Sequence, residues 1–371
     1  MGDFRNKEKG NKGEIIMKNL VILGGGYGGM RVLARLLPNS LPEDVSITLI
    51  DRHPYHCLKT EYYALAAGTI SDQHVRVAFP EHPRLKVIYG EITGINLDER
   101  KVLISENQEV EYDDLIIGLG CEDKYHNVPG AKEFTYSIQS IEKARSTYQA
   151  LNNLPADSVV AIVGAGLSGV ELASELIESR PDLKIKLFDR GKFILSAFSE
   201  RLSTYVENWF DNRNVEIINN SNITRIEENT VYNHDEPAIC DVIVWTAGIQ
   251  PNIIVREMEA EKDAQGRLVI TSHHSLPNND HVYVVGDCAS LPYAPSAQLA
   301  EGQADQIVQV LLKRWKGEEL PESLPPIKLK GVLGSLGKKE GFGLLNEKAI
   351  TGRVARLLKS GILWLYKYHN G

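Results

Sequence analysis

A glycine-rich fingerprint occurs twice in this chain. Residues 24–29 read GGGYGG after the apolar run 20–23, and residues 164–169 read GAGLSG after the apolar run 159–163. Both fit GxGxxG between a strand and a helix, where the first glycine makes a tight turn, the second lets the backbone approach a pyrophosphate and the third packs helix on strand. The sequence therefore predicts two βαβ units.

Each fingerprint is followed, at a similar distance, by a second apolar run that ends in an acid. These acids are Asp51 and Asp189. An acid at this position is placed to accept hydrogen bonds from a ribose diol. Two complete units imply two dinucleotides bound at once, and the economical reason to hold two is to pass a hydride from one to the other. We therefore predict a flavin reductase.

Length and charge narrow the class of protein further. A chain of 371 residues suits two or three domains. With 43% hydrophobic residues, most of the chain is expected to fold around a packed core. The net charge is -8 and no stretch is densely basic, so nucleic acid is not expected as a partner.

The termini and the hydropathy bear on location. Residues 1–16 are polar and lack the apolar region of a secretory signal, so we expect a disordered N-terminal extension. No window reaches the roughly 18 apolar residues that a membrane-spanning helix needs. We expect a cytoplasmic protein, or one bound peripherally to the inner face of the cell membrane.

Cysteine and histidine spacing excludes two kinds of site. The four cysteines, Cys57, Cys121, Cys240 and Cys288, form no CxxC pair. That argues against a dithiol reductase, which needs two cysteines closing a small ring beside the flavin, and we expect reduced, mostly buried thiols. The ten histidines show no HxxxH or HExxH spacing, so we predict no metal.

The order of predicted elements indicates that one unit is inserted into the other. A strand-rich region over 87–117 follows the first unit, a helix over 138–151 leads into the second, and the second repeats the same plan. We expect an α/β fold with two Rossmann-like dinucleotide-binding domains. The outer domain comprises 17–130 and 267–326, the inserted domain 131–266, and a short C-terminal β/helix segment 327–371.

Five motifs in this order resemble the two-dinucleotide flavoprotein family. They are GxGxxG at 24–29, YDDLIIGLG at 112–120, GxGxxGxE at 164–171, WTAG at 245–248 and GD at 286–287. Within that family, Pro54-Tyr55-His56 before Thr60 and the pair Ala297-Gln298 are similar to type II NADH dehydrogenases, the single-chain NADH:quinone oxidoreductases. The resemblance covers roughly 17–343. It implies non-covalent FAD in the outer domain, NADH in the inserted domain, and a quinone that accepts electrons at the membrane surface.

The resemblance assigns residues of the outer domain to FAD. The expected FAD-binding residues are Gly24, Gly26, Tyr27, Gly28, Gly29, Asp51, Arg52, Lys59, Thr60, Gly120, Gly286, Asp287 and Ala297. Asp287 matches the family acid that bonds the ribityl chain, and Lys59 and Thr60 fall where the family lays its chain along the isoalloxazine, although Lys59 fits a solvated side chain equally well. Ala297 and Gln298 open a helix whose positive end can stabilise charge on the reduced flavin, and Gln298 is an expected catalytic residue.

The resemblance also assigns an NADH site in the inserted domain. Its expected binding residues are Gly164, Gly166, Gly169, Asp189 and Gly248. An acid at Asp189 repels a 2′-phosphate and so favours NADH over NADPH, while the neighbouring Arg190 works against that preference. Glu171 matches a family glutamate near the nicotinamide and is the second expected catalytic residue. Its alternative role is an ordinary first-turn glutamate stabilised by the helix dipole.

Two regions depart from the family pattern. The family motif AQxAxQ begins at Ala297, but here Gln303 stands one position late, which leaves the quinone site open. The tail 351–371 carries Arg353, Arg356, Lys359 and Lys367 and no acid, and Val354, Leu357, Leu358, Gly361 and Leu365 line one helical face. The tail predicts a helix on an anionic membrane surface, or one docked on its own protein or on the mate in a homodimer.

Two other functions remain open on sequence grounds. Cys121, directly after Gly120, is suggestive of a sulfide:quinone oxidoreductase, but the other cysteines are not placed persuasively for one. The second alternative is a non-enzymatic, NADH-sensing or scaffold protein that keeps the fold without an acceptor site.

Overall fold

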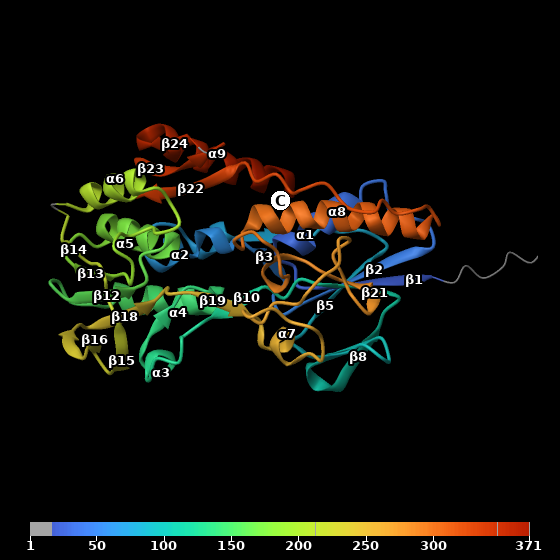
Figure 1. Cartoon of the computed structure of the whole chain (residues 1–371), viewed down its shortest axis with the longest axis horizontal. Coiled ribbons are helices and arrows are strands. Elements are labelled where there is room, and N and C mark those ends of the chain that lie inside the picture. The colour runs from blue at the N-terminus through green and yellow to red at the C-terminus, as the bar shows by residue number, and fades with distance from the viewer. Residues whose placement is uncertain (1–16, 212, 347, 371) are drawn as a thin grey trace, which may run out of the picture.

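Two parallel sheets dominate the computed structural model, which describes residues 17–211, 213–346 and 348–370 (Figure 1). The expected N-terminal extension, residues 1–16, lies outside the described residues. The two sheets and the helices around them confirm the predicted α/β class. They form an outer unit and an inserted unit, which lie side by side.

The outer unit contains a sheet of six strands, all parallel except one at the edge. In spatial order they are β20 (Ser275–Leu276), β21 (Asn279–Val284), β9 (Asp114–Ile117), β1 (Lys18–Leu23), β2 (Val45–Asp51) and β5 (Leu85–Tyr89). β20 is the antiparallel strand. The central strands of this six-stranded sheet are mostly apolar, because the sheet is covered on both faces.

Different layers cover the two faces of this sheet. Leu20 and Ile22 of β1 pack in the cluster that includes helices α1 (Tyr27–Leu36) and α8 (Ala297–Trp315). The alternate residues Val21 and Leu23 pack against an antiparallel meander. Its strands are β6 (Ile92–Asn96), β7 (Lys101–Ile104) and β8 (Gln108–Glu111).

The inserted unit repeats this plan around a five-stranded, fully parallel sheet. In spatial order its strands are β11 (Tyr136–Ser137), β18 (Val242–Trp245), β12 (Val159–Val163), β13 (Lys184–Phe188) and β14 (Val215–Ile218). The helices are α3 (Ala131–Phe134), α4 (Ile141–Asn152), α5 (Leu167–Ser179) and α6 (Glu200–Phe210). The meander strands are β15 (Ile223–Glu227), β16 (Thr230–Asn233) and β17 (Glu236–Ile239).

The chain crosses between the units through one short antiparallel pair. Strand β10 (Cys121–Asp123) leaves the outer unit and β19 (Ile249–Pro251) returns to it. The following helix α7 (Ile253–Glu257) packs into the outer unit, where Val255 and Met258 join the same cluster as Val21. The return therefore lies before residue 266, where we expected the inserted domain to end.

A connecting region of the outer unit lies between β2 and β5 along the chain. It contains β3 (Tyr55–Cys57), a short 3-10 helix (Lys59–Glu61), α2 (Tyr62–Ala66), a second 3-10 helix (Asp72–Val75) and β4 (Arg76–Ala78). α2 packs against both α4 and α5 of the inserted unit. This region therefore belongs to the interface between the units.

The C-terminal segment forms a three-stranded antiparallel sheet followed by a helix. Its elements are β22 (Gly331–Leu336), β23 (Glu340–Leu345), β24 (Lys348–Thr351) and α9 (Gly352–Asn370). α9 packs on β22 and β23, and β22 packs on α5. Figure 1 shows α9 lying over this sheet. Among the described helices, none has the length and apolarity to span a membrane.

Candidate functional site

The two fingerprint loops show the same use of their first and third glycines. Gly24 has φ +94° and Gly164 has φ +106°, a left-handed conformation that favours glycine. A Cβ on Gly29 would overlap the carbonyl oxygen of Gly24, and one on Gly169 would overlap that of Gly164. These four glycines are therefore required by the tight packing of each helix on its loop.

The middle glycines face open space. A Cβ on Gly26 or on Gly166 would meet no described atom within 4 Å. These residues are also the N-caps of α1 and α5, and neither helix receives a side-chain cap from the described residues. Each helix therefore presents uncapped N–H groups and the positive end of its dipole to an open cradle, an arrangement that fits a pyrophosphate.

The two acids make equivalent backbone hydrogen bonds. The Asp51 carboxylate accepts from Gly25 N–H at 2.7 Å and His53 N–H at 2.8 Å. The Asp189 carboxylate accepts from Ala165 N–H at 2.9 Å and Gly191 N–H at 2.7 Å. Each acid thus ties the fingerprint loop to the end of the next parallel strand. Arg52 and Arg190, which follow these acids, are both exposed.

Lys59 reaches the crossing strand and is not a solvated surface lysine. Its Nζ donates to Cys121 Sγ at 3.0 Å and to the Cys121 carbonyl at 3.4 Å. Burial opposes the charge of Lys59, but the hydrogen bond to Cys121 and the negative charges of Asp287 and Asp123 raise its pKa, so it is cationic at neutral pH. Burial raises the pKa of the Cys121 thiol to about 12, which keeps it protonated. The structure therefore brings Lys59 and Asp287 into one electrostatic cluster.

Other expected outer-unit residues surround this cluster. The hydroxyl oxygens of Tyr27 and Thr60 lie 2.8 Å apart, and Tyr27 opens α1 directly after Gly26. Gly120 and Gly286 both have positive φ, and a Cβ on Gly120 would meet no described atom within 4 Å. A Cβ on Gly28 would overlap Val285, so this glycine serves packing.

The first turns of α8 contain Gln298 and the displaced Gln303, and both side chains have defined contacts. Ser296 caps the helix by accepting from Leu299 N–H, and Ala297 is its first residue. The side-chain oxygen of Gln298, Oε1, accepts from Lys330 N–H at 2.5 Å and so holds the segment that leads into β22. Gln303 is fully buried, and its Oε1 accepts from Gly286 N–H at 2.8 Å. Its Nε2 has no partner among the described atoms.

Glu171 is buried beneath the C-terminal segment. It is 4% exposed, and its Oε1 accepts from Ser335 N–H at 2.9 Å, from Ser335 Oγ at 3.1 Å and from Lys359 of α9. Lys359 also donates to the Tyr63 hydroxyl at 2.8 Å. Glu171 is therefore not an ordinary solvated first-turn glutamate: it joins the inserted unit to α2 and α9. Sequence reasoning missed Ser335 and Tyr63, which carry no motif.

A second acidic group lies beside this pair. Burial raises the pKa of Glu61 to about 7, although Lys359 works in the opposite direction. Glu61 is 6% exposed and directly follows Lys59 and Thr60. The region between α2, α5 and α9 therefore contains a carboxyl group that titrates near neutral pH.

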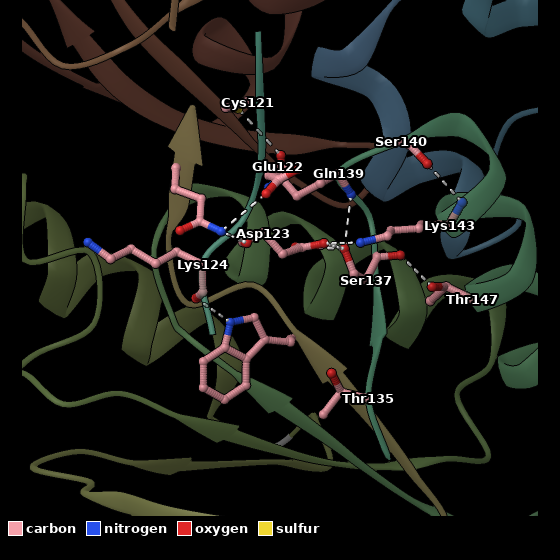
Figure 2. A network of polar contacts seen from close by, with 12 residues as sticks. Cys121, Glu122, Asp123, Lys124, Thr135, Ser137, Gln139, Ser140, Lys143 and Thr147 are labelled. Carbon is pink, nitrogen blue, oxygen red and sulfur yellow. Dashed lines mark hydrogen bonds and ion pairs between the residues drawn. The ribbon is translucent and has the colours of Figure 1, made fainter. Parts of the chain in front are cut away.

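A polar network holds the crossing strand to the inserted unit (Figure 2). The Asp123 carboxylate is buried, accepts from Ser137 Oγ at 2.7 Å and pairs with Lys143 Nζ at 2.6 Å. Figure 2 shows Lys143 and Ser137 directed at Asp123 from α4 and β11. Because Asp123 lies two residues after Cys121, the network fixes the strand that Lys59 contacts. No sequence motif identified it.

The cysteines of the chain lie in different surroundings. Cys288 donates to the Gly120 carbonyl at 3.3 Å, while Cys240 is buried in the cluster between the second sheet and its meander. Cys240 therefore lies away from Cys121 and Cys288, which flank the Gly120 region. In the described part of the chain, no group of three or more His, Cys, Asp or Glu side chains is placed to hold a metal.

Comparison with known proteins identifies the family. Residues 18–304, which contain both fingerprints, match the pyridine nucleotide-disulphide oxidoreductases. The chain belongs to this family. Membership confirms the predicted relationship to two-dinucleotide flavoproteins and implies a flavin and a pyridine nucleotide for this oxidoreductase.

Relatives of this oxidoreductase cover almost all of it. It is 70% identical over 355 residues to the NADH dehydrogenase-like protein YutJ of Bacillus subtilis (strain 168), covering 96% of this chain and 100% of the relative. It is 24% identical over 382 residues to the Type II NADH:quinone oxidoreductase of Staphylococcus haemolyticus (strain JCSC1435), covering 93% and 94%. Its fold matches that of NDH2 from Plasmodium falciparum, solved in complex with NADH, with a TM-score of 0.81, 17% identity and coverage of 95% and 96%.

Proposed function

We propose that this oxidoreductase is an FAD-dependent NADH dehydrogenase that delivers two electrons to a quinone or a quinone-like acceptor. The observation that carries the proposal is the pair of equivalent open cradles at Gly26 and Gly166, each with an acid held at the end of the next strand. The names of the two relatives described above, one an NADH dehydrogenase-like protein and one a Type II NADH:quinone oxidoreductase, support it.

In this proposal the outer unit binds FAD. The loop 24–29 receives the pyrophosphate, Asp51 binds the adenosine ribose, and Asp287 binds the ribityl chain. FAD supplies the chemistry of accepting a hydride and releasing two electrons. Lys59 is cationic, is held by Cys121 and interacts with Asp287. In this proposal it is positioned to offset negative charge on the flavin.

The inserted unit binds NADH in the same manner. Gly164, Gly166 and Gly169 form the phosphate cradle, Asp189 accepts from the ribose diol, and Gly248, at φ +108°, follows the strand beside it. No general acid or base is needed for hydride transfer between two stacked rings, so these residues act by position. Glu171 lies at the junction of the units, where Ser335 and Lys359 hold its carboxylate in place.

Flavin analysis and a reduction experiment test the proposal. The purified protein is expected to release FAD and not FMN, because Asp51 is placed for an adenosine ribose that FMN lacks. Anaerobic NADH should bleach the visible flavin band, and a soluble quinone should restore it. A protein without flavin, with FMN, or with flavin that NADH does not reduce would contradict the proposal.

We further propose that α9 lies on an anionic membrane surface. Its outward face carries exposed apolar side chains, with Leu357 72% and Trp364 62% exposed, together with Val354, Ile362 and Leu365. Lys359 points inward to Glu171, so at most Arg353, Arg356 and Lys367 remain for lipid headgroups. An amphipathic helix of this kind binds through buried apolar area plus attraction to anionic lipids.

Substitutions on the outward face separate membrane contact from folding. The double variant Leu357→Ser/Trp364→Ser should bind phosphatidylserine-containing vesicles at least about 10-fold less well, because it removes the two most exposed of these side chains. Ile239→Ser, which removes a 66% exposed side chain from β17, is the matched control and should bind like the wild type. Equal binding by all three proteins, or no binding by the wild type at low salt, would contradict membrane contact.

A further inference from the structure

The inner face of α9 also reaches the first fingerprint loop. Tyr366 lies seven positions, or two helical turns, after Lys359, so the two side chains share one face of the helix. The Tyr366 hydroxyl lies 3.0 Å from His56 Nε2, and His56 Nδ1 lies 2.7 Å from the Gly25 carbonyl oxygen. Tyr366, which is 310 positions from His56 in the sequence, is thus linked to the loop through the His56 side chain.

The direction of these two hydrogen bonds follows from their chemistry. His56 is 0% exposed, and burial lowers its pKa to about 4, so the ring is neutral at physiological pH. A neutral imidazole has one donor and one acceptor, and the Gly25 carbonyl can only accept. Nδ1 therefore donates to Gly25, and Nε2 accepts the hydroxyl proton of Tyr366.

The peptide groups of Gly25 are consequently held from both sides. Its N–H donates to Asp51 at 2.7 Å, and its carbonyl accepts from His56. The next residue is Gly26, which faces the open cradle. The Tyr27 ring adds contacts to both partners: its centroid lies 5.0 Å from that of His56 and 5.3 Å from that of Tyr366.

We propose that the C-terminal helix is part of the FAD site, because Tyr366 orients His56 and His56 holds the Gly25 carbonyl that shapes the phosphate cradle. Tyr366 and His56 are positioning residues, since neither is assigned a contact with the cofactor. The proposal rests on the proposed FAD site of the outer unit.

This connection makes cofactor binding and helix docking reciprocal. If a docked α9 increases the affinity for FAD, bound FAD must stabilise the docked helix by the same factor. The same helix face also holds Glu171 of the inserted unit through Lys359. The inner face of α9 therefore contacts both fingerprint units, through Lys359 and Tyr366.

The first test measures the dissociation constant of FAD for the apoprotein by fluorescence titration. Tyr366→Phe removes one hydroxyl and should raise that constant about 2- to 10-fold, the effect of one hydrogen bond. Tyr368→Phe, the same substitution on a 71% exposed side chain of the same helix, is the matched control and should leave it unchanged. Equal constants for the wild type and Tyr366→Phe would overturn the proposal.

A double-mutant cycle tests whether the effect passes through His56. An asparagine amide can replace Nδ1 as the donor to Gly25 but does not reach the position of Nε2. In the His56→Asn background, Tyr366→Phe should therefore cause no further change in FAD affinity. Additive losses would show that Tyr366 does not act through His56 and would overturn the proposal.

Two further measurements distinguish an effect on the FAD cradle from an effect on helix packing alone. The melting temperature of each apoprotein reports packing, and variants that lower it without changing FAD affinity would make α9 a structural helix only, contrary to the proposal. Hydrogen exchange at the Gly25 amide should be faster in Tyr366→Phe than in Tyr368→Phe, and equal exchange would count against it. Wild-type apoprotein that binds no FAD would instead overturn the proposed function, and this inference with it.

Discussion

Asp189 acts at the scale of a single residue in two ways at once. It holds the fingerprint loop through Ala165 and Gly191, and in the proposed NADH site it also accepts from the ribose diol. Asp189→Asn keeps an acceptor oxygen for the loop but removes the charge that repels a 2′-phosphate. We expect the ratio of kcat/KM for NADH over NADPH to fall about 10-fold, comparable to the loss of a charged hydrogen-bond partner.

Arg190 supplies the comparison for that experiment. It is exposed beside Asp189, and Arg190→Ala should increase the preference for NADH, because a cation that attracts the 2′-phosphate is lost. A wild-type enzyme that prefers NADPH would show that Arg190, and not Asp189, governs the choice.

His56 predicts a specific dependence of stability on pH. Its pKa falls from 6.5 to about 4 on folding, mainly through burial, so the unfolded chain binds more protons between these values. The free energy of unfolding should therefore be fully retained above pH 6.5 and fall as the pH drops toward 4, by about 3 kcal/mol from this group. In urea unfolding at neutral and acidic pH, His56→Asn should lose less stability than the wild type. Identical losses would mean that folding does not lower the pKa of His56.

At the scale of one element, the ion pair between Lys359 and Glu171 determines how α9 docks. Both side chains are largely buried, with exposures of 12% and 5%. Lys359→Met strands the Glu171 carboxylate, which should lower the free energy of unfolding by about 3–5 kcal/mol. The double variant with Glu171→Gln should recover part of this loss, because no buried charge remains.

A surface pair at the C-terminal end of α8 provides the control for that measurement. Lys313 and Glu318 lie 3.5 Å apart with side-chain exposures of 44% and 50%, so Lys313→Met should cost less than about 1 kcal/mol in the same urea unfolding assay. If Lys359→Met costs no more than Lys313→Met, the buried pair does not anchor α9.

The scale of the whole molecule concerns the orientation of the two units. Asp123 is 1% exposed and is held by Ser137 and Lys143, so it fixes β10 against α4 and β11. Asp123→Asn should slow flavin reduction by NADH by up to about 100-fold, since a misplacement of about 1 Å between donor and acceptor has effects of that size. Single-turnover absorbance measures this rate.

The matched variant preserves the charge at the crossing. Lys143→Arg keeps a cation beside Asp123 and should reduce the flavin at nearly the wild-type rate. Rates should be compared per bound FAD, because Asp123 also interacts with Lys59 of the proposed FAD site. A normal rate in Asp123→Asn would mean that the network stabilises the fold without setting the distance between the nucleotides.

Local sequence was sufficient to predict the two fingerprints, the acids that follow them and the α/β class. Gly24 and Gly164 need a positive φ, Gly29 and Gly169 need to lack a Cβ, and parallel strands buried on both faces need continuous apolar runs. These requirements are written in neighbouring residues. Family membership and the two parallel sheets confirm that part of the prediction.

Only the tertiary structure decided the partners of the polar side chains. Lys359 and Glu171 are 188 positions apart, and Tyr366 and His56 are 310 apart, so no local pattern relates them. From its sequence the tail is an amphipathic segment with four cations, and nothing in it distinguishes Lys359 from the other three. Packing buried that lysine against a carboxylate from another unit, since a charge removed from water must find a partner wherever the fold provides one.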